Sequence, residues 1–260
     1  MSSQSAIALP PAPAVHYLTL RLKSSAHAKP LCRFFTDLAV DETLIVGFGV
    51  RLVAGLGGNI AGLKGFPSLQ RPGGAIPVTQ GDVWVCARGA APADALDRIL
   101  AVVRGLPGGM EFVEDQPAFT RQGSADDSAT VTEGPPAESC FCVVQRWVFD
   151  AGGDAASPRG SISLPVPMLQ CSTSFGNAQE QGRYFAAFGP DLDAFETVMR
   201  RMVGEPDGLV DPLFQRARPV TGGYYWCPAV KDGHLDLAPM FAAGGLAALP
   251  DVEFTPSAES

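Results

Sequence analysis

Residues 82–103 read DVWVCARGAAPADALDRILAVV, and this stretch decides the fold. Its first eight residues, DVWVCARG, alternate as the side chains of a strand do. Pro92 then opens a helix, since proline suits the first helical turn, where its missing N–H would be unpaired anyway. One face of this helix is apolar and carries Leu96, Ile99, Leu100 and Val103. The stretch therefore predicts a strand that is followed directly by an amphipathic helix.

A second copy of this strand–helix unit lies in the other half of the chain. Residues 182–202 read GRYFAAFGPDLDAFETVMRRM, which is a strand candidate and then a helix that Pro190 opens. The apolar face of that helix carries Phe195, Val198, Met199 and Met202. The same unit at an equivalent place in both halves predicts an internal duplication.

Further strand and helix candidates surround the two units. The strand candidates are HYLTLRLK (16–23), SCFCVVQRWVFD (139–150), VPMLQCS (166–172) and GGYYWCP (222–228). Residues 25–38 predict a helix, and residues 46–56 predict a short strand or turn that leads into another. Strands mixed with helices, without long buried parallel runs, predict an α+β fold in which each half is a sheet carrying helices on one face.

Two stretches with few large apolar side chains mark the boundaries of the predicted halves. Residues 1–14 are rich in alanine and proline and predict a flexible N-terminal arm. Residues 121–138, RQGSADDSATVTEGPPAE, contain few large apolar side chains and predict a linker. The two halves are then residues 15–120 and residues 139–260.

Charge and composition exclude several classes of protein. The chain has 260 residues, of which 46% are apolar, and 27 acidic against 19 basic side chains give a net charge of −8. This balance argues against nucleic acid and anionic membranes as partners, since both need a basic face. No apolar run reaches the length of a membrane span, and the first 20 residues carry no Lys or Arg. We therefore expect a cytoplasmic protein.

The cysteines and histidines limit metal chemistry. The six cysteines are Cys32, Cys86, Cys140, Cys142, Cys171 and Cys227, and no two have the C-x2-C spacing of a zinc site. We expect buried, reduced thiols and no metal, with Cys140 and Cys142 on one face of a strand. The chain has only three histidines, at positions 16, 27 and 234. The glycine-rich GLGGNIAG (55–62) lacks the third glycine of a dinucleotide fingerprint and predicts a turn.

Four stretches together resemble the dye-decolorising peroxidase (DyP-type haem peroxidase) family. Residues 44–89 contain LIVGFGV, LKGFPSL and PVTQGDVWVCARG, similar to that family's G-F-G turn, F-P segment and T-Q-G-D strand. CFCVVQRWVFD (140–150) resembles its Q-R-W-V-H-D strand. Residues 168–204, which begin MLQCSTSFG, and RPVTGGYYWCP (218–228) complete the set. The resemblance spans most of the chain and implies two ferredoxin-like halves, each an antiparallel sheet with helices.

The resemblance also implies a haem site in the C-terminal half, with a proximal histidine and a distal aspartate and arginine that help to cleave peroxide. At the position that resembles the aspartate, in FTRQGSADD (119–127), this chain has Gln122, and at the arginine it has Gln170. An amide neither shuttles a proton as a carboxylate does nor carries the charge of a guanidinium. The proximal histidine is also missing, since no histidine lies between His27 and His234. We therefore expect a degenerate member of the family without catalytic residues for peroxidase chemistry.

These departures favour a protein that has lost haem binding and peroxidase activity and has no cofactor. Such a protein would be a non-catalytic binding or assembly partner, or would hold another ligand. It would form an oligomer with itself or with an active relative, and its acidic surface favours a basic or neutral partner.

Two alternatives stay open at this point. Haem could still be bound by a non-standard ligand, Cys171 or His234, which would keep a haem-dependent peroxidase or oxidoreductase. A new enzyme activity could instead use Glu138, Arg146 or Asp150. The sequence therefore leaves open whether the chain is an enzyme.

Overall fold

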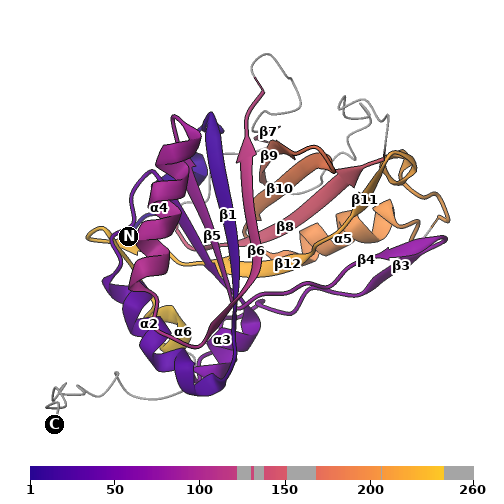
Figure 1. The fold of residues 1–260 in the computed structure, drawn as a ribbon. Helices are drawn as coiled ribbons and strands as arrows, with labels where there is room; N and C mark the ends of the chain where they lie inside the picture. The colour runs from indigo at the N-terminus through magenta and orange to yellow at the C-terminus, as the bar shows by residue number, and fades with distance from the viewer. Residues whose placement is uncertain (122–129, 132–137, 151–167, 206, 243–260) are drawn as a thin grey trace, which may run out of the picture.

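The computed structural model describes residues 1–121, 130–131, 138–150, 168–205 and 207–242 (Figure 1). Its strands are β1 (Ala14–Leu22), β2 (Leu44–Phe48), β3 (Leu69–Arg71), β4 (Gly74–Ile76), β5 (Val83–Gly89), β6 (Met110–Phe119), β7 (Thr130–Val131), β8 (Cys140–Phe149), β9 (Leu169–Gly176), β10 (Gln181–Gly189), β11 (Ala217–Pro219), β12 (Gly223–Cys227), β13 (Val230–Lys231) and β14 (His234–Leu235). Its helices are α1 (Ser5–Ala8), α2 (Ala28–Asp37), α3 (Val50–Gly55), α4 (Pro92–Gly105), α5 (Leu192–Met202) and α6 (Pro239–Ala242), with 3-10 turns η1 (Ser25–His27) and η2 (Pro212–Gln215).

Strands from both halves close into one barrel. Within the described chain their order is β10-β8-β12-β2-β5-β1-β6-β9, and β9 pairs back with β10. All these pairings are antiparallel. A closed sheet has no unpaired edges, so its inner face becomes a protected interior.

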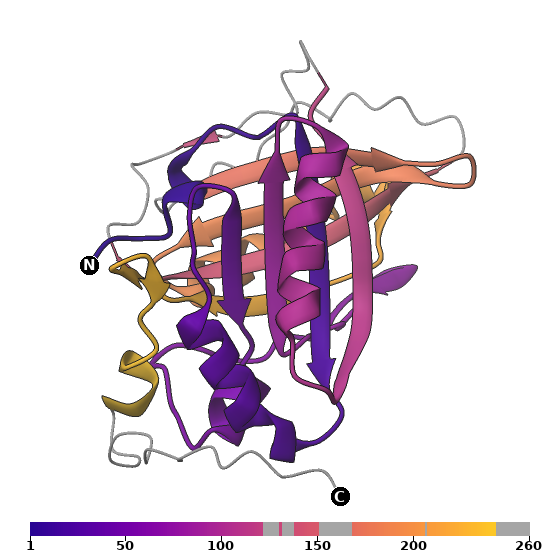
Figure 2. The ribbon, with the colours of Figure 1, turned by 60° about the vertical axis from the view of Figure 1, so that its left-hand side comes forward.

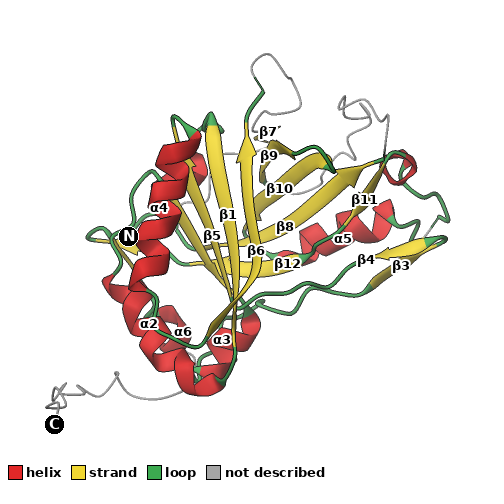
Figure 3. Cartoon of the chain, in the orientation of Figure 1, coloured by secondary structure: helices red, strands yellow, loops and turns green. Residues whose placement is uncertain are grey.

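Each half of the barrel has the same strand order, which confirms the predicted duplication and the α+β fold. The first half reads β6-β1-β5-β2 and the second reads β12-β8-β10-β9. In both, the strands stand in the order fourth, first, third, second along the chain, which is the ferredoxin-like arrangement. Figure 3 shows the two sets of strands and the helices outside them.

The helices lie on the outer face of the barrel. In the first half α4 covers β1 and β5, and α2 packs on β2 through Phe35 and Phe48. Leu18 and Phe35 belong to this outer core. In the second half α5 covers β8, with Phe195 in the same core. Figure 2 shows α4 lying along the strands of the first half. None of the described helices is long and apolar enough to span a membrane.

Both strand–helix units begin close to their predicted positions, with two differences in detail. Helix α4 starts at Pro92, but its buried face carries Ala95, Ile99 and Val102, while Leu96 is 42% exposed. The small Ala95 packs on Gly89, where an added Cβ would lie 2.7 Å from the Ala95 nitrogen.

Helix α5 starts at Leu192 rather than at Pro190. Asp191 is its N-cap, because its carboxylate accepts a hydrogen bond from the Ala194 N–H at 2.9 Å. Pro190 therefore precedes the cap and lies outside the helix.

The two halves meet at thin seams. Strand β12 joins β2 through the pair Trp226 and Phe48, and β6 joins β9 through Phe119 and Ser174. At the first seam the fully buried side chain of Gln4 makes hydrogen bonds to the backbone that a neighbouring strand would otherwise make. Its amide donates to the Val46 carbonyl at 2.8 Å and the Pro228 carbonyl at 3.1 Å, and its oxygen accepts from the Val46 N–H at 2.8 Å.

The N-terminal residues 1–14, for which the sequence predicts a flexible arm, lie against the barrel in the structure. Besides the contacts of Gln4, the backbone of Ser2 pairs with Val230. The guanidinium of Arg88 also donates to the carbonyls of Ala6 and Pro10. Composition alone could not reveal this docking, because it depends on one buried amide and on backbone carbonyls.

Replacing Gln4 with alanine is expected to destabilise the fold by about 1–3 kcal/mol, because the buried Val46 N–H and C=O lose their partner. Urea unfolding followed by tryptophan fluorescence measures the loss. Gln179→Ala removes an exposed glutamine and serves as the control, with no expected change. Equal stability of both variants would contradict a structural role for Gln4.

Two segments, one of them the predicted linker, lie mostly outside the described residues. These are the linker, of which only residues 121, 130, 131 and 138 are described, and the connection from β8 to β9. In the first half, the equivalent connection from β1 to β2 contains η1 and α2. Gly57 and Gly62, within the glycine-rich stretch, adopt positive φ angles of 74° and 85°, as a turn requires.

Candidate functional site

Four aromatic side chains fill the middle of the barrel, and none is more than 2% exposed. Tyr17 lies flat on Tyr184, with ring centroids 3.7 Å apart and planes inclined by 8°. Trp84 stacks on Tyr17 at 6.1 Å and on Tyr225 at 6.2 Å. The Trp84 indole N–H donates to the Tyr184 hydroxyl at 3.0 Å. Strand alternation brings these rings inward from β1, β5, β10 and β12.

A charged network closes one mouth of the barrel above these rings. Arg146, on β8, pairs through Nε with Glu114 at 3.0 Å and through Nη1 with Glu180 at 2.7 Å. The Tyr184 hydroxyl donates to the other Glu114 oxygen at 3.3 Å. Arg146 also lies over the ring of Phe175 at 5.2 Å. One guanidinium therefore holds two carboxylates at the end of the aromatic stack.

Glu114 is the more buried of the two carboxyls that Arg146 holds. Its side chain is 11% exposed, and burial raises the pKa of Glu114 although the neighbouring Arg146 acts to lower it. The same burial holds the pKa of Tyr184 well above its usual value. A buried carboxyl with a raised pKa beside a cavity marks a candidate functional position.

The network borders a cavity of about 420 Å³ at the barrel mouth. Its walls come from β1, β6, β8 and β12 and from the turn that carries Glu180. Three threonine hydroxyls line it, from Thr19, Thr79 and Thr221. The volume lies in the range of small-molecule sites, and its polar lining can orient a ligand.

The remainder of the interior is apolar and includes four cysteines. Cys86, Cys140, Cys142 and Cys227 belong to the inner core, and each is at most 5% exposed. Burial raises the pKa of Cys86 to about 12, and the pKa of the Cys142 thiol also rises through burial. The expected shared face of Cys140 and Cys142 is confirmed, and all six cysteines are free thiols. Among the described residues, no three His, Cys, Asp or Glu side chains are placed to hold a metal ion.

These thiols are expected to be inert in the folded protein, because the thiolate is the reactive form and burial suppresses it. In a reaction with Ellman's reagent, the native protein should release at most the signal of Cys171, which is partly buried. All six cysteines should react in guanidinium chloride. Fast reaction of several thiols in the native state would contradict the closed interior.

The structure does not bring together the two residues that the sequence offers as non-standard haem ligands. Cys171 on β9 faces the interior, on the side of Leu169 and Phe175, and burial raises the pKa of its thiol. His234 is exposed on the β13–β14 hairpin, opposite Lys231. They lie on different elements and different sides of the barrel wall.

The outer face of β9 is where the family resemblance places the distal arginine. Gln170, Ser172 and Ser174 point to this face, because Leu169 and Phe175 point inward. Arg183, which is 2% exposed, joins them from β10 and donates to the Ser172 hydroxyl at 3.2 Å. Gln122, at the position of the aspartate, lies outside the described residues.

The residues of this outer face do not fit a haem held in the family's manner. None of the three histidines of the chain lies on it. His16 lies on β1 and pairs with Asp115, and His27 ends the η1 turn. The third, His234, lies on its exposed hairpin. Gln170 and the neighbouring serines are neutral side chains and ordinarily do not ligate iron.

The residues proposed for a new enzyme activity are also separated. Glu138 and Asp150 are exposed at opposite ends of β8, whereas Arg146 points into the barrel mouth. Glu114 was not among the residues predicted from the sequence, because residues 110–119 were not recognised as a strand. Its acidic residues, Pro117 and a bulge between Phe112 and Glu114 leave no regular alternation of polar and apolar residues in that stretch.

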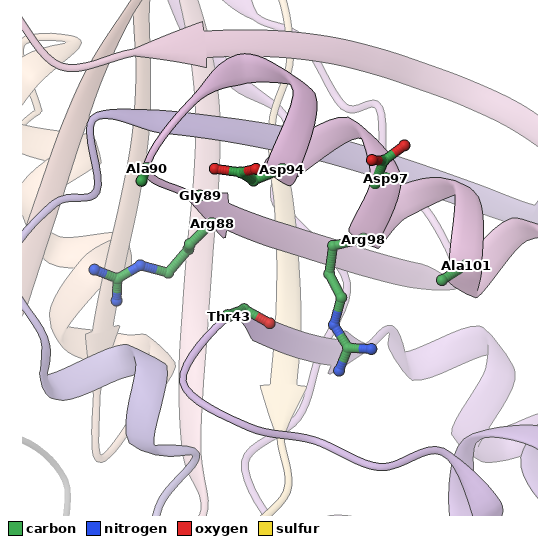
Figure 4. A pocket seen from close by; sticks show the side chains of 8 residues that line it. All are labelled: Thr43, Arg88, Gly89, Ala90, Asp94, Asp97, Arg98 and Ala101. Carbon is green, nitrogen blue, oxygen red and sulfur yellow. The ribbon is translucent and has the colours of Figure 1, made fainter.

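A second, open groove lies on the outer surface beside α4 (Figure 4). It measures about 510 Å³ and is bordered by Thr43, Arg88, Asp94 and Arg98. The guanidinium of Arg98 already has partners there, because it donates to the Ala39 carbonyl at 2.9 Å and pairs with Asp41 at 3.6 Å. Arg88 is bound to the N-terminal residues. The groove therefore has fewer available polar groups than the barrel mouth.

Comparisons with known proteins agree with the family resemblance. Residues 164–232 match the family model described as Dyp-type peroxidase, C-terminal. The fold is similar to that of a DypB variant from Rhodococcus jostii RHA1 in complex with haem, with a TM-score of 0.71 and 21% identity over 86% of this chain and 96% of that chain.

Two further solved structures have the same fold. The dye-decolorizing protein from V. cholerae gives a TM-score of 0.65 and 18% identity over 87% of this chain and 97% of that chain. The dye-decolorizing peroxidase from Bacteroides thetaiotaomicron gives 0.66 and 16% over 85% and 94%. At these identities the structural likeness concerns the fold, and activity must be argued from the site.

Proposed function

The chain belongs to the DyP-type peroxidase family, and from this premise we propose that it is a non-catalytic binding protein that has lost the family's haem chemistry. The observation that carries the proposal is the outer face of β9. It presents Gln170, Ser172 and Ser174, and no histidine, where the family resemblance requires a haem pocket.

The chemical requirements of peroxide cleavage support the proposed loss of peroxidase activity. Peroxide cleavage on haem needs an iron ligand, a proton shuttle and a cation that stabilises the departing oxygen. The positions that resemble the shuttle and the cation are both glutamine, at Gln122 and Gln170. Fold and packing can persist after such losses, because they depend on the barrel core rather than on the site.

Titration of the purified protein with haemin tests the proposal. We expect no saturable Soret band and no oxidation of a dye substrate by hydrogen peroxide above the rate of free haemin. A stoichiometric Soret band would overturn the proposal. Cys171→Ala and His234→Ala would then identify the ligand, since only the variant that removes it would lose the band.

Assembly and location are parts of the same proposal. We place the protein in the cytoplasm, in an oligomer with itself or with an active relative of its family. Support comes from the free thiols of the described chain and from the acidic net charge, −8, which favours basic or neutral partners. Light scattering coupled to size exclusion tests self-assembly. A strict monomer that also fails to capture an active relative would contradict this part.

A further inference from the structure

The cavity at the barrel mouth has rigid walls. Arg146 is fixed by ion pairs to Glu114 and Glu180, and its backbone N–H donates to the Thr221 hydroxyl at 2.8 Å. The Tyr225 hydroxyl accepts from the Gly81 N–H at 3.1 Å. Groups that are already held in place lose little freedom when a ligand arrives, so a small ligand can bind with few contacts.

The charges around the cavity are unbalanced. The carboxylates of Glu114 and Glu180 line it together with a single guanidinium, that of Arg146. His16 pairs with Asp115 from the outer face of β1. Two carboxylates therefore face one fixed cation, and the whole chain is also acidic, with a net charge of −8. A cavity with this potential attracts cations and repels anions.

The hydrogen-bonding groups left over at the cavity are the second terminal nitrogen of Arg146, which has no partner in the described chain, and several oxygen acceptors. Within the described chain, one oxygen of Glu180 is bound to Arg146 and the other has no partner. The side-chain amide of Gln116 donates to the Pro117 carbonyl, which leaves its own oxygen available. The Thr79 hydroxyl accepts from the Gly222 N–H and can still accept a second bond. Oxygen acceptors of this kind suit the donors of an ammonium group.

We propose that this cavity binds a small organic cation, a primary amine on a short aliphatic chain, with its ammonium group on Glu180. A cavity of about 420 Å³ accommodates such a molecule. The inference deepens the proposed binding function by naming its ligand class. It concerns the interior of the barrel, whereas the haem question concerns the outer face of β9, so the two can fail independently.

Three probes of equal length and different charge test the ligand class. Butylamine, butanol and butyrate are titrated into the purified protein, and amide shifts of residues at the barrel mouth are followed by NMR. We expect saturable shifts with butylamine and at least tenfold weaker binding of butanol, since a charge-assisted hydrogen bond is lost. Tighter binding of butyrate than butylamine, or no saturable binding of butylamine, would overturn the proposal.

Two glutamate variants test the position. Glu180→Gln should weaken butylamine binding about tenfold or more, because the counter-charge of the ammonium is lost. Its fold should persist, since the side chain is 35% exposed and Arg146 keeps Glu114. Glu205→Gln is the matched control, because Glu205 pairs with Arg200 beyond α5 and should leave binding unchanged. Equal affinity of both variants would overturn the site, even if haemin titration had upheld the haem-free function.

Discussion

Arg146→Ala is expected to destabilise the folded protein by about 3–5 kcal/mol at neutral pH, because it leaves a buried carboxylate without its counter-charge. The side chain of Glu114 is 11% exposed, and Arg146 is its cationic partner in the described chain. Glu180 would lose the same partner, but it is 35% exposed and water can replace the ion pair. Guanidinium unfolding of the two proteins at equal pH measures the difference.

This loss should shrink as the pH is lowered. The pKa of Glu114 is already raised by burial, and Arg146 opposes that rise, so removing Arg146 raises the pKa further. A carboxyl whose pKa is higher in the folded than in the unfolded state stabilises the fold where it is protonated, and this contribution is lost as the pH rises through the folded pKa. The gap between variant and wild type should therefore be widest near pH 8 and narrow towards the ordinary glutamate pKa of about 4.3.

A second substitution separates charge from packing. Arg146→Ala combined with Glu114→Gln removes the unpaired charge but not the gap left by the arginine side chain. The double variant should regain most of the stability at neutral pH and lose the dependence on pH, because the amide needs no counter-charge. A double variant that is no more stable than Arg146→Ala would assign the loss to packing against Phe175 instead.

Much of the fold follows from local patterns. The stretch at residues 82–103 predicts β5 and α4, and its counterpart predicts β10 and α5, since alternation and helical periodicity are properties of neighbouring residues. Which residues form the buried face of α4 was harder to predict from the sequence. Leu96 is exposed and Ala95 is buried, and the close approach of Gly89 to the Ala95 backbone is a tertiary contact that helical periodicity does not encode.

Closure of the barrel could not be predicted in the same way. It depends on seams of a single residue pair, such as Phe119 with Ser174, between segments far apart in the sequence. Strand β6 was also missed, since its acidic residues and Pro117 weaken the usual pattern of a strand. Glu114 lies on that strand, so the charged barrel mouth was absent from the sequence prediction, although Arg146 was considered.

The loss of the haem-site residues, in contrast to barrel closure, could be predicted from the sequence. Gln170 and the missing histidine are matters of residue identity, and they can be assessed from the sequence once a family resemblance supplies the expected roles. The fold adds the direction of each side chain. Gln170 faces outward and Cys171 inward on the same strand, so a thiol next to the arginine position does not point into the same space as the position itself.

Trp84→Ala is expected to cost about 3–5 kcal/mol of folding free energy, as the removal of a large buried side chain does when its surroundings cannot collapse. Trp84 is fully buried and contacts Tyr17, Tyr225 and Phe188, with ring centroids between 6.1 and 6.3 Å away. The Tyr184 hydroxyl also loses the indole donor. In a thermal scan, the melting temperature should fall by about 6–20 °C, given about 2–4 °C per kcal/mol for a domain of this size.

Closure of the barrel leads to further expectations for Trp84→Ala. Strands paired on both sides cannot move inward freely, so Trp84→Ala should leave an apolar cavity that binds indole or benzene, and either compound should raise its melting temperature without affecting the wild type. Leu96→Ala is the control, because a side chain that is 42% exposed should contribute little despite its apolar character. If Trp84→Ala were as stable as Leu96→Ala, the strands of the two halves would not enclose a common interior, and a ligand site at its mouth would lose its walls.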